Sequence, residues 1–278
     1  MKFFKFTLIV LGLLTTVDIT AQKSPESIDG GKEQKFSISA GVGTANYYGD
    51  LMQKSGLYSQ TSFSFGVGAA YNFVHRLSGR FDFGVQKVQA ADSKSKGEQY
   101  KARNLSFKST VVDLSLGAEY TILDLKKFPL SPYISAAVGI MFFDPYTTDD
   151  LTGKKQKLRE LGTEGQGLAA YPDRKIYKKS AVEFPLGIGV KYPLSDRLNL
   201  QLEFNYHFTG TDYLDDVSMN GYPDKALLDA RNPVTAQFTW RGDEVGQGGY
   251  PKNLALPRGN PDNKDGFFTT QVKVAFKL

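Results

Sequence analysis

The sequence predicts an all-β protein, an eight-stranded antiparallel transmembrane β-barrel with long extracellular loops. Three observations lead to this prediction: segments with a two-residue apolar period recur along the chain, their apolar residues are rich in aromatics, and short connections alternate with long ones. A two-residue period is typical of a strand with one buried face. An apolar outer face, a polar interior and long loops at one end are typical of outer-membrane barrels.

The N-terminal residues predict a secretory signal peptide over 1–21. Lys2 and Lys5 make a basic start, Phe6–Leu14 is an apolar core too short to span a bilayer, and Ala21 offers a small residue at the cleavage point. The polar residues 22–34 then form a periplasmic leader, and 35–278 form the barrel. We therefore expect export to the bacterial cell outer membrane.

The expected strands follow in order from the alternation, which is clearest in VDLSLGAEYTI at 112–122. Transmembrane strands need about 9–11 residues, which most of these segments reach. No segment of similar length has a helical period, so the sequence predicts no helix in this part of the chain. The strands are expected at 36–42, 63–73, 77–86, 112–122, 134–142, 182–192, 198–208 and 268–278.

The connections predict which end of the barrel faces outward. The short ones, 74–76, 123–131 and 193–196, are expected on the periplasmic side. The long ones, 44–60, 89–104, 144–178 and 210–265, are expected to be extracellular. A soluble β-sandwich is the alternative architecture for the same alternation.

Charged residues on the polar face of the strands predict a closed lumen. Bases and acids are equal in number there, and eight strands leave room only for side chains. We expect ion pairs across the interior, because a buried charge without a partner is costly. The alternative is acid–base chemistry by Asp113 and Glu119. The inward-facing charges are Lys35, Arg80, Lys191, Lys273 and Lys277 against Asp82, Asp113, Glu119, Glu183 and Glu203.

Composition argues against most catalytic and metal chemistry. The 278 residues include no Cys and only two His, which excludes disulfides and thiolate sites and leaves little for multi-histidine metal sites. His207, followed by Asp212, Asp215 and Asp216, is open to three interpretations: a catalytic rim, a Ca²⁺ site, or solvated loop residues. We expect the last, and therefore no enzyme, no cofactor, no metal and no small-molecule substrate. The chain has no Lys/Arg run that indicates nucleic-acid binding.

Several segments together resemble the PorG-like outer-membrane barrels of Bacteroidetes. They are GTANYYGDL at 43–51, RNLSFKS at 103–109, SPYISAAVGIMFFDP at 131–145, FPLGIGVKYPLSDRLNLQLEFNYHFTGTDYLDDVS at 184–218 and RGNPDNKD at 258–265. The matched loop residues are Tyr47, Tyr48, Gly49, Asp50, Asp212, Tyr213, Asp215, Asp216, Arg258, Asn260 and Asp265. The turn chemistry of these residues indicates a structural role, with Arg258 pairing one of the acids to fold the fourth long loop onto the first.

The resemblance implies an outer-membrane component of type IX secretion that anchors a periplasmic ring. Its partners would be outer-membrane lipid and periplasmic or outer-membrane secretion proteins. Lys126, Lys127 and Phe128, in the short connection 123–131, are the predicted docking residues, because interface hot spots favour buried aromatics. The alternative function is a surface-binding or adhesion barrel that uses its long loops.

Overall fold

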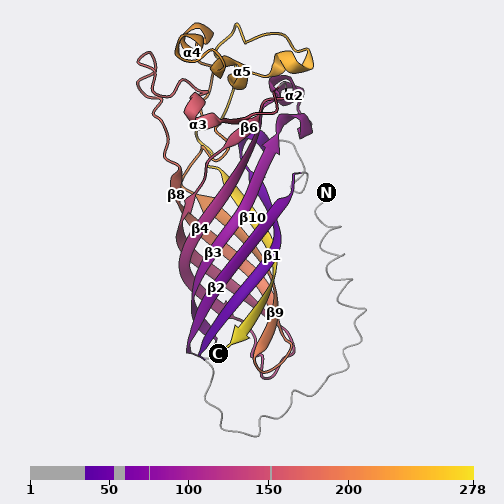
Figure 1. The fold of residues 1–278 in the computed structure, drawn as a ribbon. Helices are drawn as coiled ribbons and strands as arrows, with labels where there is room; N and C mark the ends of the chain where they lie inside the picture. Colours follow the sequence, from indigo (N-terminus) through magenta and orange to yellow (C-terminus); the bar gives the residue numbers. More distant parts are fainter. Residues whose placement is uncertain (1–34, 53–59, 75, 151) are drawn as a thin grey trace. The chain divides into compact units, whose positions relative to one another are not determined.

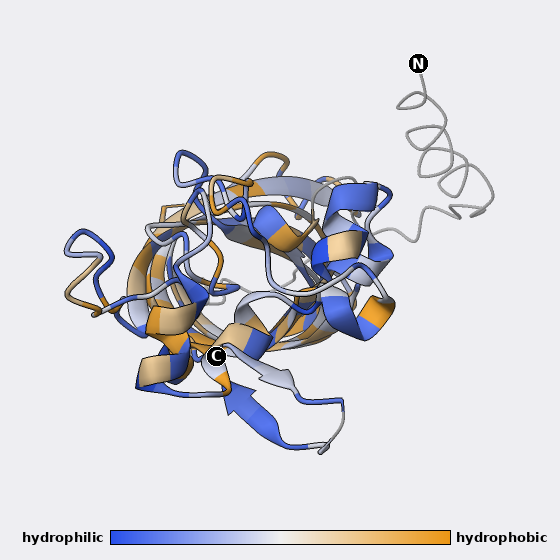
Figure 2. Ribbon diagram, turned by 90° about the horizontal axis from the view of Figure 1, so that it is seen from above, coloured by the Kyte–Doolittle hydropathy of each residue, from blue (hydrophilic) through white to orange (hydrophobic). Residues whose placement is uncertain are grey.

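Eight long strands form one closed, antiparallel barrel in the computed structural model, which describes residues 35–52, 60–74, 76–150 and 152–278 (Figure 1). The strands follow the order β3-β2-β1-β10-β9-β8-β5-β4, and pairing of β4 with β3 closes the ring seen end-on in Figure 2. The predicted eight-stranded antiparallel barrel is confirmed. The predicted signal peptide, 1–21, and leader, 22–34, lie outside the described residues. The barrel strands are β1 (Phe36–Tyr48), β2 (Ser62–Val74), β3 (Leu77–Ala91), β4 (Ser106–Thr121), β5 (Ser131–Phe142), β8 (Ser180–Pro193), β9 (Leu198–Thr209) and β10 (Gly266–Lys277).

The two ends of the barrel differ as the connection lengths predict. At one end, here called the turn end, short turns join β2 to β3, β4 to β5 and β8 to β9. At the other, here called the loop end, the connections are 49–61, 92–105, 143–179 and 210–265. The last two of these form most of the cap drawn above the barrel in Figure 1.

The outer wall of the barrel is apolar over most of its height. Large side chains such as Leu116, Val138 and Ile188 point outward and are 65%, 52% and 62% exposed. Their strand neighbours Ser115, Ala137 and Gly187 point inward, as the two-residue period requires. A continuous wall of exposed apolar side chains is the surface that a lipid bilayer covers.

Near the loop end the apolar residues move from the outer to the inner face of the strands. β1, β3 and β4 continue into this region and are therefore longer than the sequence predicts. Val88 and Phe107 are buried inside, whereas Lys87 and Lys108 point outward and are exposed. The adjacent valines Val111 and Val112 shift the apolar residues of β4 from the outer to the inner face. The predicted ends at residues 42, 86 and 112 are therefore wrong: β1, β3 and β4 continue past the apolar wall, where their outer face is mainly polar.

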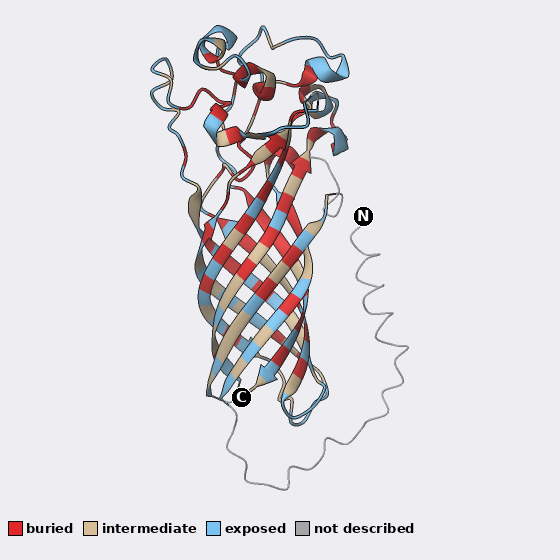
Figure 3. Ribbon diagram, in the orientation of Figure 1, coloured by how far each residue is buried: buried red, intermediate tan, exposed pale blue. Residues whose placement is uncertain are grey.

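An apolar cluster, here called the apolar plug, closes the loop end. Inward side chains of the strands, including Tyr47, Phe107 and Met141, pack against loop residues such as Leu214 and Phe238. Figure 3 shows the buried residues gathered at this end, whereas the turn end is mostly exposed or intermediate. The plug is the main apolar core, because the lumen below it is polar.

The cap contains short helices, and the prediction of no helix is wrong there. Each helix has at most 7 residues, too few to present a helical period in the sequence. Within the described part of the chain, no helix is both long and apolar enough to cross a membrane. The cap elements are the helices α2 (Glu98–Arg103), α3 (Leu158–Leu161), α4 (Lys225–Arg231) and α5 (Thr235–Thr239), the 3₁₀ turns η1 (Asp50–Met52), η2 (Asp92–Lys94) and η3 (Gly242–Val245), and the hairpin of β6 (Tyr146–Thr148) and β7 (Lys155–Lys157).

Candidate functional site

Six charged side chains fill the lower lumen, and they are here called the ion network: Arg80, Asp82, Glu119, Lys191, Glu203 and Lys273. Glu203 lies at the centre and is 1% exposed. Its carboxylate accepts hydrogen bonds from Arg80 Nη1 at 2.7 Å and from the Tyr133 hydroxyl at 2.8 Å, and it pairs with Lys273. Arg80 also binds Asp82 in a bidentate pair, with distances of 2.6 and 2.8 Å. These contacts fill the narrow interior with side chains.

The ion network is electrically balanced, with three bases against three acids. Glu119 pairs with Lys191 and lies 3.4 Å from Arg80, so every member has an opposite charge within reach. Two further bases that the sequence placed in the lumen lie elsewhere. Lys35 is exposed, and Lys277 donates to the Asp196 carbonyl oxygen at the turn end, 3.2 Å away.

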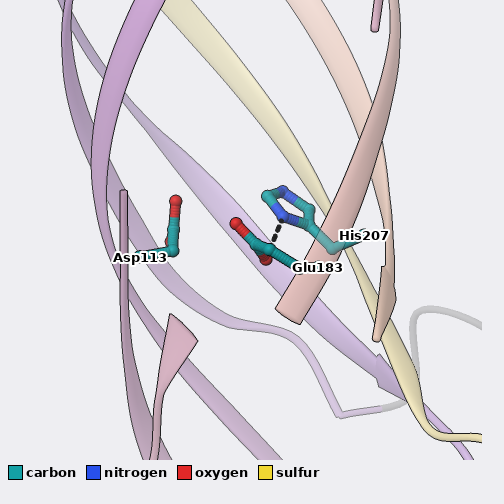
Figure 4. A group of neighbouring side chains, drawn as sticks. All are labelled: Asp113, Glu183 and His207. Carbon is teal, nitrogen blue, oxygen red and sulfur yellow. Dashed lines mark hydrogen bonds and ion pairs between the residues drawn. The ribbon is translucent and has the colours of Figure 1, made fainter. Parts of the chain in front are cut away.

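The two remaining lumen acids, Asp113 and Glu183, lie nearer the loop end and meet His207 (Figure 4). The three side chains are buried and come from β4, β8 and β9. His207 Nδ1 lies 3.0 Å from a Glu183 carboxylate oxygen, and one ligand atom from each residue lies within 4.8 Å of the others. We call these three residues the lumen triad. In this arrangement His207 faces Glu183 and Asp113, not the acids that follow it in the sequence.

The lumen triad is the grouping that sequence reasoning missed. The alternation did contain part of the information, because Tyr206 and Phe208 belong to the outward set and His207 must then point inward. The pairing of β8 with β9 sets Pro185 opposite His207 and Glu183 opposite Thr209, so Glu183 and His207 lie on the same inner face. How near Asp113 comes to them across the lumen depends on the closed ring, which the sequence pattern does not specify.

In the cap, residues of the PorG-like pattern meet around the hydroxyl of Tyr47. This hydroxyl lies 2.6 Å from Asp215 Oδ2 and 2.7 Å from Asp265 Oδ1. Gly49 packs so closely here that an added Cβ would lie 2.0 Å from both the hydroxyl and Asp265 Oδ1. Asp50 accepts a hydrogen bond from the backbone N–H of Asn260 at 2.8 Å. These contacts join the first long loop to the fourth.

Arg258 joins the third long loop to the fourth, through a partner that the sequence did not predict. Its guanidinium pairs with Glu164 and donates to Thr163 Oγ1 at 3.1 Å. The Glu164 carboxylate also accepts hydrogen bonds from the backbone N–H groups of Ser218 and Met219, at 3.0 and 2.9 Å. The expected ion pair between Arg258 and an acid of the motif is therefore wrong. Among these acids, Arg258 donates a hydrogen bond only to Asp216, and there to the backbone carbonyl oxygen, at 3.3 Å.

Asp212, Asp215 and Asp216 are 3%, 1% and 1% exposed, so the expectation of solvated loop residues is wrong, and burial favours the protonated forms of these acids. Burial and the charge of Asp50 raise the pKa of Asp215 well above its usual value, and burial together with Asp215 does the same to Asp265. A single phenol proton serves only one acceptor, so a proton on Asp215 or Asp265 satisfies the second contact with Tyr47. Burial raises the pKa of Asp212 and that of Asp216 to about 7.

The remaining residues of the pattern line the same part of the molecule. The ring of Tyr213 stacks on Tyr177 with a centroid distance of 4.5 Å, and the Tyr177 hydroxyl donates to Asp216 at 2.6 Å. Tyr48 points outward, is 51% exposed and packs edge-on against Tyr206. The side chains of the pattern that hold the cap together are therefore Tyr47, Asp50, Tyr213, Asp215, Asp216, Arg258 and Asp265, whereas Asn260 contributes its backbone N–H.

At the turn end, the predicted docking residues lie on one exposed turn. Lys126, Lys127 and Phe128 are all exposed, and Phe128 keeps 47% of its accessible surface. The backbone N–H groups of Lys127 and Phe128 both donate to the Asp124 carbonyl oxygen at 2.9 Å. The turn therefore has a defined shape and presents an aromatic ring beside two cations.

Comparison with solved structures finds several proteins of low sequence identity. The neisserial surface protein A structure has 12% sequence identity and a TM-score of 0.42, over 87% of this chain and 97% of that one. A major outer-membrane protein of Thermus thermophilus has 17% identity and a TM-score of 0.41, over 88% and 99%. The Yersinia pestis attachment invasion locus protein Ail has 9% identity and a TM-score of 0.41, over 89% and 100%.

Comparison with curated proteins gives no match. Residues 28–224 match the model of a protein family described as "Domain of unknown function (DUF6089)". That match spans more than half of the chain, and so the protein belongs to the DUF6089 family.

Proposed function

We propose that the protein is a non-enzymatic barrel of the bacterial outer membrane that docks periplasmic proteins of a type IX secretion machine. The observation that carries this proposal is the closure of the lumen. The ion network fills its lower part, and the apolar plug closes its loop end. A barrel closed in this way acts through its two end surfaces, because it has no continuous path for a solute.

An outer-membrane location is supported by the apolar outer wall and by the expected signal peptide. The link to secretion rests on the resemblance to PorG-like barrels. In support of a common architecture, Tyr47, Asp215 and Asp265 of the shared pattern meet in one buried cluster.

The proposed docking surface is the turn with Lys126, Lys127 and Phe128. In the proposed orientation the long loops lie outside the cell, so the turn end faces the periplasm. An exposed aromatic ring beside two ammonium groups fits a partner with an apolar pocket edged by carboxylates. Binding would bury Phe128, and hot spots of protein interfaces are typically such aromatic anchors. The cations would steer the encounter with the acidic edge.

The test compares two variants expressed from the native locus. Lys126→Ser, Lys127→Ser and Phe128→Ser are combined in one variant, and Leu194→Ser and Arg197→Ser, on a neighbouring turn of the same end, make the matched control. We expect the docking variant to lose export of secreted cargo and retention of the periplasmic ring in outer-membrane fractions, with unchanged barrel abundance. The control should keep both.

Deletion of the gene tests the same proposal without assuming which turn docks. We expect loss of cargo export and of ring attachment. Normal secretion together with normal ring retention in the deletion strain would contradict the secretion role.

The alternative function, surface binding by the loops, is favoured by one observation. The hairpin of β6 and β7 carries exposed lysines, including Lys154 and Lys155, at the loop end. A polyanionic partner would suit this charge. Under this alternative, changing both lysines to Gln weakens adhesion of whole cells to sulfated polysaccharide, whereas the docking variant leaves it unchanged.

A further inference from the structure

We infer that the lumen triad is a buried binding site for one first-row divalent metal ion, of which Zn²⁺ is the best probe. Asp113, Glu183 and His207 are 3%, 0% and 5% exposed, so all three are withdrawn from water. An imidazole with two carboxylates is a donor set that suits Zn²⁺ and neighbouring transition metals better than Ca²⁺ or Mg²⁺.

One polar atom of each triad residue is buried without a hydrogen bond to the described part of the chain. Asp113 Oδ2, Glu183 Oε1 and His207 Nε2 have no hydrogen-bond partner among the described residues. Buried polar groups are otherwise almost always paired, and an unpaired carboxylate oxygen is costly. Two of these atoms belong to neighbouring carboxylates, and a shared cation satisfies both; the imidazole nitrogen that faces the carboxylates is Nδ1, which lies 3.0 Å from the other Glu183 oxygen.

The net charge of the lumen triad also favours a bound cation. The ion network balances its own three bases with its own three acids. Asp113 and Glu183 are therefore left without an arginine or lysine partner. A protonated His207 compensates one negative charge of the triad, whereas a divalent cation with a neutral imidazole compensates both. The buried charge of the triad therefore closes to zero either with a bound divalent cation or with protons on both His207 and one carboxylate, and the experiment below distinguishes these two states.

Two glycines leave space in the lumen for the carboxylates of the triad. Gly84 faces Asp113 across β3 and β4, and Gly139 faces Glu183 across β5 and β8. An added Cβ would lie 2.6 Å from Asp113 Oδ2 at Gly84 and 3.0 Å from Glu183 Oε1 at Gly139. These two positions leave room for the carboxylates because they have no side chain.

The distances between donor atoms are close to those of a metal site. Bonds of about 2.0–2.2 Å set neighbouring ligands of a tetrahedral ion about 3.4 Å apart. The contact between His207 Nδ1 and Glu183 is 3.0 Å, and all three donors lie within 4.8 Å of one another. In Figure 4 the Glu183 carboxylate lies between the side chains of Asp113 and His207.

The surroundings suit a resident ion. Above the triad, Phe267 of the apolar plug stacks on the His207 ring, with centroids 4.1 Å apart and an interplanar angle of 14°. Beside the triad, a cavity of about 40 Å³ is lined by Asp113, His207 and Gln271 among others. This volume holds at least one water, which completes the coordination of the ion.

The experiment measures zinc in the purified full-length chain, folded in detergent and free of any histidine tag. The protein is equilibrated with ZnCl₂ at micromolar free concentration, separated from free metal, and analysed by mass spectrometry of the elements. We expect close to one zinc ion per chain for the wild type. His207→Ala and the double variant Asp113→Asn, Glu183→Gln should retain less than a tenth of that.

Two control variants separate the triad from other sites. His75→Ala removes the second of the two histidines in the sequence, and Glu119→Gln changes a carboxylate of the ion network. Both should keep one zinc ion per chain. Equal loss of zinc in either control would overturn the assignment to the triad.

Co²⁺ provides a readout that does not depend on the folding of any variant. Bound to wild type, Co²⁺ should give the intense visible d–d bands of a four- or five-coordinate site, and added Zn²⁺ should abolish them. If folded wild type takes up neither ion above the level of His207→Ala, or if it gives only the weak spectrum of hydrated Co²⁺, the triad binds protons alone and the inference is wrong.

Discussion

Replacing Glu203 by Leu tests whether the ion network holds the barrel closed. Glu203 is 1% exposed and is the shared partner of Arg80 and Lys273. The substitution also removes the acceptor of the Tyr133 hydroxyl, which lies 2.8 Å from the carboxylate. We expect a large loss of stability, because Lys273 then has only Asp82 within reach, and Arg80 has Asp82 and the more distant Glu119, in a lumen with little water.

The expected loss of unfolding free energy follows from the ion pairs that remain in the Glu203→Leu variant. Arg80 keeps its bidentate pair with Asp82, but Lys273 keeps only Asp82, at 3.7 Å. The network passes from three acids to two against three bases, and its net charge changes from zero to +1. Breaking a buried ion pair typically costs about 3–5 kcal/mol of unfolding free energy. Glu203→Gln retains the shape and some hydrogen bonds, so its cost should be smaller.

The assay is a urea titration of the folded barrel in lipid vesicles, with the unfolded fraction read from its slower migration on unboiled gels. Gln201→Leu is the matched control, because Gln201 is also buried, points into the lumen from β9 and carries no charge. We expect the order wild type, Gln201→Leu, Glu203→Gln, Glu203→Leu, from most to least stable. If Glu203→Leu is as stable as Gln201→Leu, the ion network does not stabilise the barrel.

Three further predictions concern the outer wall and the cap. Leu202→Arg should cost about 2–4 kcal/mol of unfolding free energy in vesicles and Leu202→Ala less, because Leu202 points outward and is 48% exposed; normal folding of the arginine variant alone would show that this face does not meet lipid. Arg258→Met should leave Glu164 buried without its cation, so proteases should cut the third and fourth loops faster while the barrel remains folded; unchanged cleavage would refute the role of this pair. The cap should loosen as pH rises from about 4 to 7, since Asp216 has its pKa raised to about 7 from 3.8 and its folded form holds the proton that its unfolded form releases. The fluorescence of Trp240, the single tryptophan, reports this change, and Asp216→Asn should flatten the pH dependence; an identical pH profile in that variant would assign the titration to another group.

Much of the barrel follows from the sequence, because alternation is a local property of each strand. The strands of the apolar wall were predicted with small errors at their ends. The larger errors, at β1, β3 and β4, arise where the chain passes from the apolar wall to the cap. There, Val111 begins a buried inner face while Lys108 is exposed, so the apolar residues change sides. From Val111 toward the loop end, the rule that apolar side chains face lipid therefore no longer holds.

The cap was less predictable, because its contacts join residues far apart in the chain. Asp215, Asp216 and Arg258 were singled out from the sequence, but Glu164 carries no local pattern that marks it as the partner of Arg258. The two are 94 residues apart and meet only after the third and fourth loops pack together. The lumen triad is similar: each side chain has a predictable direction, whereas their convergence depends on closure of the ring.

Substituted-cysteine labelling in cells tests the central claim, a lipid-spanning barrel with the cap outside and the docking turn in the periplasm. The chain has no cysteine, so single variants at Lys155, Lys126 and Val138 give unambiguous labels. With a membrane-impermeant maleimide, the Lys155 variant should react in intact cells and the Lys126 variant only after the outer membrane is permeabilised. The Val138 variant, on the apolar wall, should react only after denaturation. Labelling at Val138 in intact or permeabilised cells, or labelling at Lys126 in intact cells, would contradict the account.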